Sequence, residues 1–417
     1  MLRAGWGKVE FTPSGSQPLA GYAHLRERRS RRVRDALFAR AIAFEQGQVS
    51  AAILAFDLLM VTEDLAEALR SRLRDAGVFL IVHATHTHSS IGGFVPGLLG
   101  RLFAGAYRPS VLERLADAGE RAVREALASL APASLAVTSR TLPGLNGNRR
   151  DPNGPKDEEL TVFRVARGND HAIGVSYPAH PVIVAERDHF AVSADFPGEV
   201  VRRLEEEAAF SIFVQGSLGG VDVLFPSAPT SVEQNLSMIS DPIVHSARHL
   251  ARIAEPVSGP VAVASEEWEV GPARPDPFFD DQPAARLRRP VAALLGRLVP
   301  SSIRSARIQG LRVGPFALIG TPADLGVGLG LAIKRQARAS GLAHPIAASQ
   351  CDGYIGYLHR AEDYRTAPAR SHRGMAHYEN AMAFFGHESG EAAFEAACRV
   401  VNELAAARCA TRTPDGQ

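Results

Sequence analysis

The segment from residue 51 to residue 82 constrains the fold more than any other part of the chain. The apolar run Ala51–Phe56 has the length of a buried strand, and a second such run, Phe79–Val82, follows it. Between them Thr62 is a suitable helix N-cap, leucines recur at positions 65, 69 and 73, and Gly77 can end the helix. A strand, a helix and a strand in this order form a β-α-β unit. Such a unit pairs its strands in parallel and indicates an α/β fold.

The rest of the chain continues this alternation. The apolar periodicity predicts helices over Val111–Ser129 and Val232–Ile253, the second broken or kinked at Pro242. Apolar runs predict strands at Ile173–Tyr177, Phe210–Gln215, Val261–Val270, Ile308–Val313, Phe316–Gly320 and Ile346–Ser349. We therefore expect mixed, largely parallel sheets flanked by helices. The sequence has no evident internal repeat.

Composition excludes several classes of protein. The chain has 417 residues, with 46 Lys+Arg against 45 Asp+Glu, and this balance argues against a nucleic-acid-binding protein. Three cysteines without metal-type spacing argue against a disulfide framework and favour a reducing compartment. No apolar run approaches about 18 residues, so no membrane span is expected. The first residues lack the apolar core of a signal peptide, which favours a cytoplasmic location. Oligomeric state is not indicated.

Polar residues follow five of the predicted strands at the point where each strand ends. Ligand sites in open α/β sheets lie beyond the carboxyl ends of the strands, so these residues predict one composite site there. The segments concerned are His86–His88, His180, Gly216–Asp222, Thr321–Asp324 and Asp352–Tyr357.

The histidines His83, His86 and His88 are the strongest indication of chemistry. Neutral imidazole is a common metal ligand and the usual proton carrier near pH 7. In an extended chain His86 and His88 point the same way. The alternative is a polar strand end with solvated histidines. His180 lies between two prolines and is interpreted as a ligand rather than a residue that caps its strand.

Several segments remain open to more than one interpretation. Pro272–Pro300 is a linker, a lid or a partner surface, and Gly92–Tyr107 could cover the site. The apolar stretch Phe94–Phe103 indicates either a greasy substrate with peripheral membrane contact or a loop packed on the body of the protein. His245 and His249, four residues apart on a predicted helix, are interpreted as surface or packing residues because no third ligand accompanies them.

In their order, six short motifs resemble the neutral/alkaline (non-lysosomal) ceramidase family over about residues 4 to 390. The resemblance rests on Gly5–Pro13 with Pro18–Tyr22, Thr85–Ser89, Asn148–Arg150, Ser193–Gly198, Gln215–Ser217 and Gly353–Tyr357. It implies a zinc-dependent amidohydrolase of lipid metabolism that acts on a small-molecule or lipid-like N-acyl substrate. We expect one catalytic unit made of an N-terminal half (residues 1–260, carrying the His ligands), a C-terminal half (261–410) and a disordered tail (411–417).

By this resemblance the zinc ligands fall on His86, His180, Asp324 and Tyr357. His88 matches a neighbouring catalytic histidine, which could move protons between the water and the leaving amine. Arg149 and Tyr378 match residues that contact the polar head of the substrate, where either could stabilise an oxyanion. Tyr354 is a rival to Tyr357, and Asp324 is alternatively an N-cap of the helix after it.

The chain also departs from the family pattern. Asp324 stands where the family usually has Glu, and Asp222 stands where ceramidases carry a serine. The family's C-terminal immunoglobulin-like domain has no counterpart here. These departures favour a substrate other than ceramide. Two alternatives therefore stay open: a catalytically inactive binding protein, and a metal-dependent esterase or phosphoesterase, the latter often with two metals.

Overall fold

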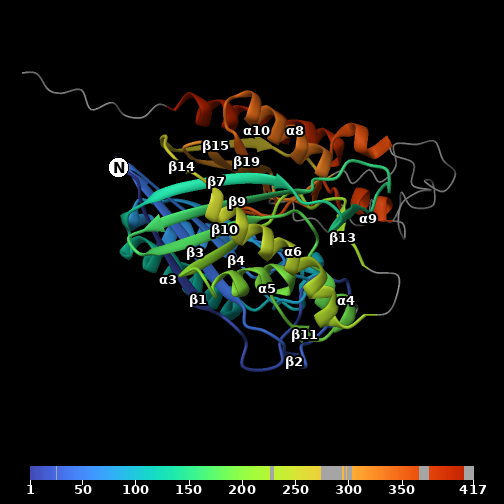
Figure 1. Ribbon diagram of the computed structural model, residues 1–417. Coiled ribbons are helices and arrows are strands. Elements are labelled where there is room, and N and C mark those ends of the chain that lie inside the picture. The colour runs from blue at the N-terminus through green and yellow to red at the C-terminus, as the bar shows by residue number, and fades with distance from the viewer. Residues whose placement is uncertain are drawn as a thin grey trace, which may run out of the picture.

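The computed structural model describes residues 1–24, 26–225, 230–273, 303–365 and 375–407, together with residues 294 and 297. Within these residues the strands form three larger sheets, which are surrounded by helices (Figure 1). The predicted segment Pro272–Pro300 lies almost entirely outside the described residues, and so does the predicted tail. No helix in the described part of the chain is long and apolar enough to cross a membrane.

The first sheet has the strand order β5-β4-β3-β1-β6. Its strands are β1 (Arg3–Glu10), β3 (Phe38–Gln46), β4 (Val49–Phe56), β5 (Phe79–Ala84) and β6 (Ala131–Pro132). The helices α1 (Glu63–Arg72) and α3 (Pro109–Ala128) cover its outer face. Thr62 caps α1 as predicted, since its hydroxyl accepts a hydrogen bond from the Leu65 amide at 3.2 Å.

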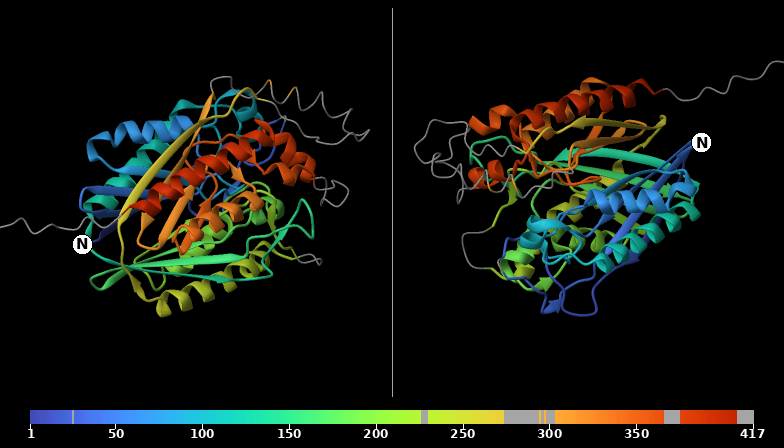
Figure 2. Two further views of the ribbon diagram at one scale, coloured as in Figure 1. Left: turned by 90° about the horizontal axis from the view of Figure 1, so that it is seen from above. Right: turned by 180° about the vertical axis from the view of Figure 1, so that it is seen from behind.

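The second sheet has the order β12-β10-β9-β7-β14, and the third has the order β15-β16-β17-β19. Their strands are β7 (Ser134–Thr141), β9 (Glu159–Arg167), β10 (Asp170–Ser176), β12 (Phe210–Val214), β14 (Pro256–Val257), β15 (Val261–Glu269), β16 (Ser305–Val313), β17 (Phe316–Gly320) and β19 (His344–Ala348). The second sheet is covered by α5 (Asp195–Leu204) and α6 (Val232–Ile253), the third by α8 (Val327–Ala339) and α10 (Gly386–Ala406) (Figures 1 and 2).

The same topology occurs in all three sheets, although the sequence shows no repeat. In each, three successive strands pair antiparallel, a helical connection follows, and the fourth strand returns parallel to the third. A second helix then packs beside the first. The topology repeats without a sequence repeat because it needs only matching apolar faces, not matching residues.

The α/β fold with helix-flanked mixed sheets is confirmed, but the expectation of largely parallel sheets is wrong. Antiparallel pairs dominate, and the parallel pairs in the described larger sheets are β4/β5, β10/β12 and β17/β19. The excess of antiparallel pairing comes from hairpins such as β3/β4, which turn at Gly47 and need no crossover. Helix α6 has the predicted bounds and continues through Pro242 rather than breaking there.

The three sheets share a central core and each has a separate outer core. In β4, Ile53 packs into the central core with Phe163 and Phe316 from the other two sheets, while Leu54 faces α1 and α3. Strands buried on both faces are continuously apolar, which is why the sequence shows them so clearly. The first two larger sheets are built from residues before 260, and the third begins with β15 at Val261; the expected division into two halves stays a prediction.

Shorter elements lie beyond the ends of these strands. They are β2 (Arg32–Val33) paired with β11 (Ala191–Val192), β8 (Asn146–Asn148) paired with β13 (Val221–Val223), β18 (Asp324–Leu325) paired with β20 (Tyr357–Leu358), the helices α2 (Gly97–Ala104), α4 (Ile183–Arg187) and α9 (Met375–Met382), and the 3-10 turns η1 (Arg74–Ala76) and η2 (Ala361–Arg365). Most of them gather at the carboxyl ends of the parallel pairs, where the sequence predicts the site.

Candidate metal centre

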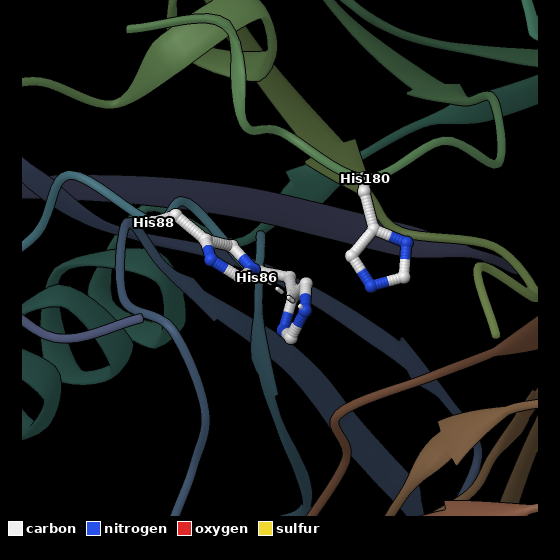
Figure 3. A group of neighbouring side chains, drawn as sticks. All are labelled: His86, His88 and His180. Carbon is white, nitrogen blue, oxygen red and sulfur yellow. Dashed lines mark hydrogen bonds between the residues drawn. The ribbon is translucent and has the colours of Figure 1, made fainter. Parts of the chain in front are cut away.

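Three of the predicted histidines meet where β5 and β10 end. His86 and His88 follow β5, and His180 follows β10; in the described residues these three form a group able to hold a metal ion (Figure 3). The Nε2 atoms of His86 and His88 lie 3.3 Å apart. The backbone at His86 is not extended as expected but left-handed, with φ of 69°. The turn at this residue, rather than strand alternation, brings the two rings together.

Backbone carbonyls orient two of these rings. Nδ1–H of His86 donates to the Leu59 carbonyl at 2.7 Å, and Nδ1–H of His180 donates to the Val221 carbonyl at 2.9 Å. Because a carbonyl can only accept, Nε2 of each ring keeps its lone pair. Burial holds the pKa of both imidazoles below the ordinary value, so both rings are neutral. This is the state in which imidazole binds a metal.

The two-stranded sheet β18/β20 supplies a carboxylate and a phenol opposite these rings. Asp324 and Tyr357 are register partners in the β18/β20 pair. Asp324 Oδ1 lies 3.5 Å from His86 Nε2, and the Tyr357 hydroxyl lies 3.4 Å from His180 Nε2. Tetrahedral zinc with bonds of about 2.0–2.1 Å places neighbouring ligands roughly 3.3 Å apart. The donor types therefore suit a zinc ion, and each of these two pairs has the spacing of neighbouring ligands on one ion.

Two further side chains bind Asp324. The Tyr354 hydroxyl donates to Asp324 Oδ2 at 2.8 Å, and the Gln350 amide donates to Oδ1. Tyr354, the rival for the ligand position, is thus a partner of the carboxylate, whereas the hydroxyl that faces His180 is that of Tyr357. Asp324 makes no cap to the following helix, whose N-cap is Gly326 without a side-chain bond.

Arg149 lies against the same donor atoms. Its Nη2 is 3.1 Å from His180 Nε2 and 2.9 Å from the Tyr357 hydroxyl, and its Nη1 is 3.0 Å from Asp222. One lone pair of His180 serves either Arg149 or a metal ion. Metal binding at His180 therefore requires the guanidinium to move off this nitrogen.

Glu379 is a buried charged residue beside the candidate site that the sequence analysis did not single out. It is fully buried and accepts hydrogen bonds from Arg149 at 2.6 Å and from Arg150 at 3.1 Å. Burial alone would raise the pKa of Glu379, but Arg149, His359 and Arg150 outweigh it and hold this pKa well below the ordinary value. Its one sequence signal is its place directly after Tyr378 on α9, which gives one helix contact with both the cavity and Arg149.

A cavity of about 600 Å³ opens beside these residues. His86, His88, Asp324, Tyr357 and Tyr378 line one end. Apolar side chains line much of the remainder. Val95, Leu99 and Phe103 come from α2 and the residues just before it, and Ile355, Met382 and Phe384 come from α9 and from residues next to it and to β20. The stretch expected to cover the site thus forms a wall of the cavity. Tyr378 is 40% exposed and its ring lies 6.3 Å from that of Tyr357.

His83, the third histidine of the predicted cluster, does not join the site. Its Nδ1–H donates to the Ser349 carbonyl at 3.0 Å, and its Nε2 accepts from the Gln215 amide at 2.9 Å. Ser349 directly follows β19 of the third sheet, and Gln215 directly follows β12 of the second. The His83 ring therefore connects all three sheets. His245 and His249 are exposed on α6, as expected.

The chain resembles known ceramidases in sequence and in fold. It matches the description "neutral/alkaline non-lysosomal ceramidase, N-terminal" over residues 3–216. The neutral ceramidase of Mycobacterium tuberculosis (strain ATCC 25618 / H37Rv) is 23% identical over 463 aligned residues, which cover 87% of this chain and 72% of that protein.

Two solved structures have the same fold. The crystal structure of neutral ceramidase from Pseudomonas aeruginosa superposes with a TM-score of 0.78 at 20% identity, covering 97% of this chain and 74% of that one. A ceramidase complexed with C2 gives a TM-score of 0.79 at 18% identity, covering 97% and 75%. Because the family match spans more than half of its length, this protein belongs to the neutral/alkaline non-lysosomal ceramidase family.

Proposed function

We propose that this protein is a zinc-dependent hydrolase that cleaves an amide bond in a lipid-like N-acyl substrate. The observation that carries the proposal is the convergence of His86, His180, Asp324 and Tyr357 beside a cavity with a largely apolar lining, which His86, Asp324 and Tyr357 reach directly. The two imidazole lone pairs are aimed by backbone carbonyls, and the carboxylate is held by Tyr354 and Gln350. Such support from outer residues is what orients metal ligands in proteins.

A bound zinc ion supplies Lewis acidity and an acidified water molecule at this point. His88 is the proton carrier beside it. Burial, the neighbouring His86 imidazole and the charges of Arg28 and Arg149 keep the pKa of His88 well below its ordinary value, so its neutral ring can accept a proton. The same ring can then return the proton to the nitrogen of the leaving amine.

Arg149 and Tyr378 are the groups that can neutralise charge on the substrate. Burial alone would lower the pKa of Arg149, but Asp222 and Glu379 raise it well above the ordinary value, so the guanidinium stays charged. Once it leaves His180, its Nη2 can donate to a developing oxyanion. Tyr378, exposed at the cavity, can donate from its hydroxyl. Val95, Leu99 and Phe103 offer apolar surface to an acyl chain.

The experiment that tests this combines metal analysis with hydrolysis. Protein purified without added metal or chelator is analysed for zinc as wild type, His86→Ala, His180→Ala and the control His245→Ala, whose side chain is exposed on α6. We expect about one firmly held zinc per chain in wild type and control and its loss in the other two. The same four proteins are assayed on N-acyl amines of graded chain length. Stoichiometric zinc in both ligand variants contradicts the assignment.

One observation favours the second candidate, a non-catalytic binding protein. Asp222 and Glu379 together hold Arg149 against His180 and Tyr357, where it bonds two of the four donor atoms. Zinc-loaded wild type that hydrolyses neither N-acyl amines nor their matched esters would favour this candidate. Cleavage of the esters alone would favour an esterase.

A further inference from the structure

We propose that His24 and His189 form a second, weaker binding site for a divalent transition metal, separate from the centre at His86. Their Nε2 atoms lie 3.2 Å apart. Ligands of one tetrahedral zinc ion are roughly 3.3 Å apart, so this spacing is the one that two imidazoles on a shared ion adopt. The proposal goes beyond the hydrolytic function and does not depend on it.

The tautomer of His189 leaves a lone pair on its Nε2 atom, which can bind a ligand. Nδ1–H of His189 donates to the Ala185 carbonyl at 3.2 Å, which is the same kind of backbone bond that orients His86 and His180. Nε2 of His189 therefore carries a lone pair that faces His24. Burial, His189 and Arg28 lower the pKa of His24, so this ring is also neutral near pH 7.

The backbone at each residue of the pair is fixed by hydrogen bonds to a different part of the fold. The His24 amide donates to the Leu102 carbonyl at 2.9 Å, which fixes its loop against α2. His189 lies in the turn after α4, where the Arg31 amide donates to the Phe190 carbonyl at 2.9 Å. A pair brought together by separate elements is preorganised for a shared ligand, because little motion is left to lose on binding.

Tyr22 lies beside the pair. Its ring is 5.7 Å from that of His189, and among the described residues its buried hydroxyl has no hydrogen-bond partner. Burial and the carboxylate of Glu186 raise the pKa of this hydroxyl. His24 and His189 are half-buried, so water can complete the coordination.

The charge of Arg28 sets which cations the site prefers. A guanidinium near His24 weakens the attraction for any cation. Ions that bond strongly to imidazole, such as Zn²⁺, Ni²⁺ and Cu²⁺, overcome this repulsion, whereas Mg²⁺ and Ca²⁺ prefer oxygen ligands. Without a cation, His24 donates an Nε2–H to His189 and the pair is a simple hydrogen bond. A bound cation would replace this hydrogen bond, because both Nε2 atoms would then bind the ion.

The test is equilibrium dialysis of the zinc-loaded full chain against Zn²⁺ and Ni²⁺, with bound metal measured by elemental analysis. His24→Gln and His189→Gln remove one imidazole each, and the double variant His245→Gln/His249→Gln is the matched control. That exposed pair on α6 also has a metal-compatible spacing but no bond that fixes either ring. Circular dichroism checks that all variants are folded.

We expect wild type and control to bind a further metal equivalent, and each single variant to lose it while keeping the first. Mg²⁺ and Ca²⁺ should not bind in its place. Retention of the further equivalent in both single variants, its loss in the control, or its absence from wild type would each overturn the proposal. Failure of the centre at His86 is a distinct result, since only His86→Ala and His180→Ala remove the first equivalent.

Discussion

The junction of the three sheets and the metal centre lie a few residues apart, and both are built around buried histidines. His83 at the junction and His86 at the centre are each almost fully buried, so burial does not tell them apart. The difference is in their ring nitrogens. Protein groups use both nitrogens of His83, but only Nδ1 of His86 has a backbone partner. A histidine whose second nitrogen faces other metal-binding side chains is the one available for chemistry.

The largest effect that this comparison predicts is on stability. His83→Ala leaves the Gln215 backbone amide without a partner, leaves the Ser349 carbonyl with only the weak Cys351 thiol donor, and opens space between the sheets. We expect the free energy of unfolding to fall by about 4 kcal/mol, measured by urea denaturation. His86→Ala, with one backbone bond lost, should cost clearly less in metal-free protein. Equal losses in the two variants would contradict the distinction.

The comparison also shows how far the sequence could predict the molecule. Strand β17 has the predicted bounds because its apolar run is unbroken, and helix α6 because its apolar residues keep a helical period over its whole length. Strands such as β3 and β9 were not predicted because charged residues interrupt them. The antiparallel hairpins that they form were therefore not predicted either. Residue types at strand ends therefore predicted where the site lies better than how the sheets pair.

Within the site, side-chain types were predictable but partners were not. His86, His180, Asp324 and Tyr357 do converge, whereas His83, of the same type and in the same segment, has a structural role. What separates them is the position of backbone carbonyls such as that of Leu59, which no residue pattern records. Glu379 was missed because its importance comes from contacts with residues about 230 positions earlier in the chain.

The next effect concerns the two tyrosines near Asp324. Tyr354→Phe removes a hydrogen bond to the carboxylate but no proposed ligand, so we expect zinc affinity to fall on the order of 10–100-fold. Tyr357→Phe removes a proposed ligand and should lower affinity further. Tyr177→Phe is the control, since its hydroxyl donates to the Leu142 carbonyl away from the site. Competition with a chromogenic chelator measures all three, and a larger effect at Tyr354 would exchange the two roles.

A smaller effect is expected from Gly21, which touches the ring of His88. A Cβ at this position would lie 2.8 Å from His88 Nδ1, and its φ of 124° already disfavours a side chain. Gly21→Ala should shift His88 without removing a metal ligand. We expect zinc to be retained and N-acyl hydrolysis to fall about tenfold, a loss of roughly 1.4 kcal/mol.

Gly144→Ala is the matched control for this change. Gly144 also has a positive φ, of 86°, but no atom lies within 4 Å of its added Cβ. This variant should therefore suffer backbone strain without a change in activity. If both glycine variants lose the same activity, strain in the fold and not the position of His88 explains the loss.

The last prediction concerns how stability depends on pH. Burial lowers the pKa of His83 from 6.5 to about 3 in the folded protein. Between these values the unfolded chain binds a proton that the folded chain excludes, so stability is complete above pH 6.5 and falls as the pH drops toward 3. One such group changes the free energy of unfolding by at most about 1.4 kcal/mol per pH unit. The other buried histidines act in the same direction, and metal release would add to it.

We therefore compare His86→Ala with His86→Ala/His83→Asn in metal-free urea denaturation, which isolates the contribution of His83. The double variant should show the shallower dependence. Parallel curves would mean that His83 can be protonated in the folded protein. The two protein partners of its ring nitrogens would then not distinguish His83 from the histidines of the metal centre.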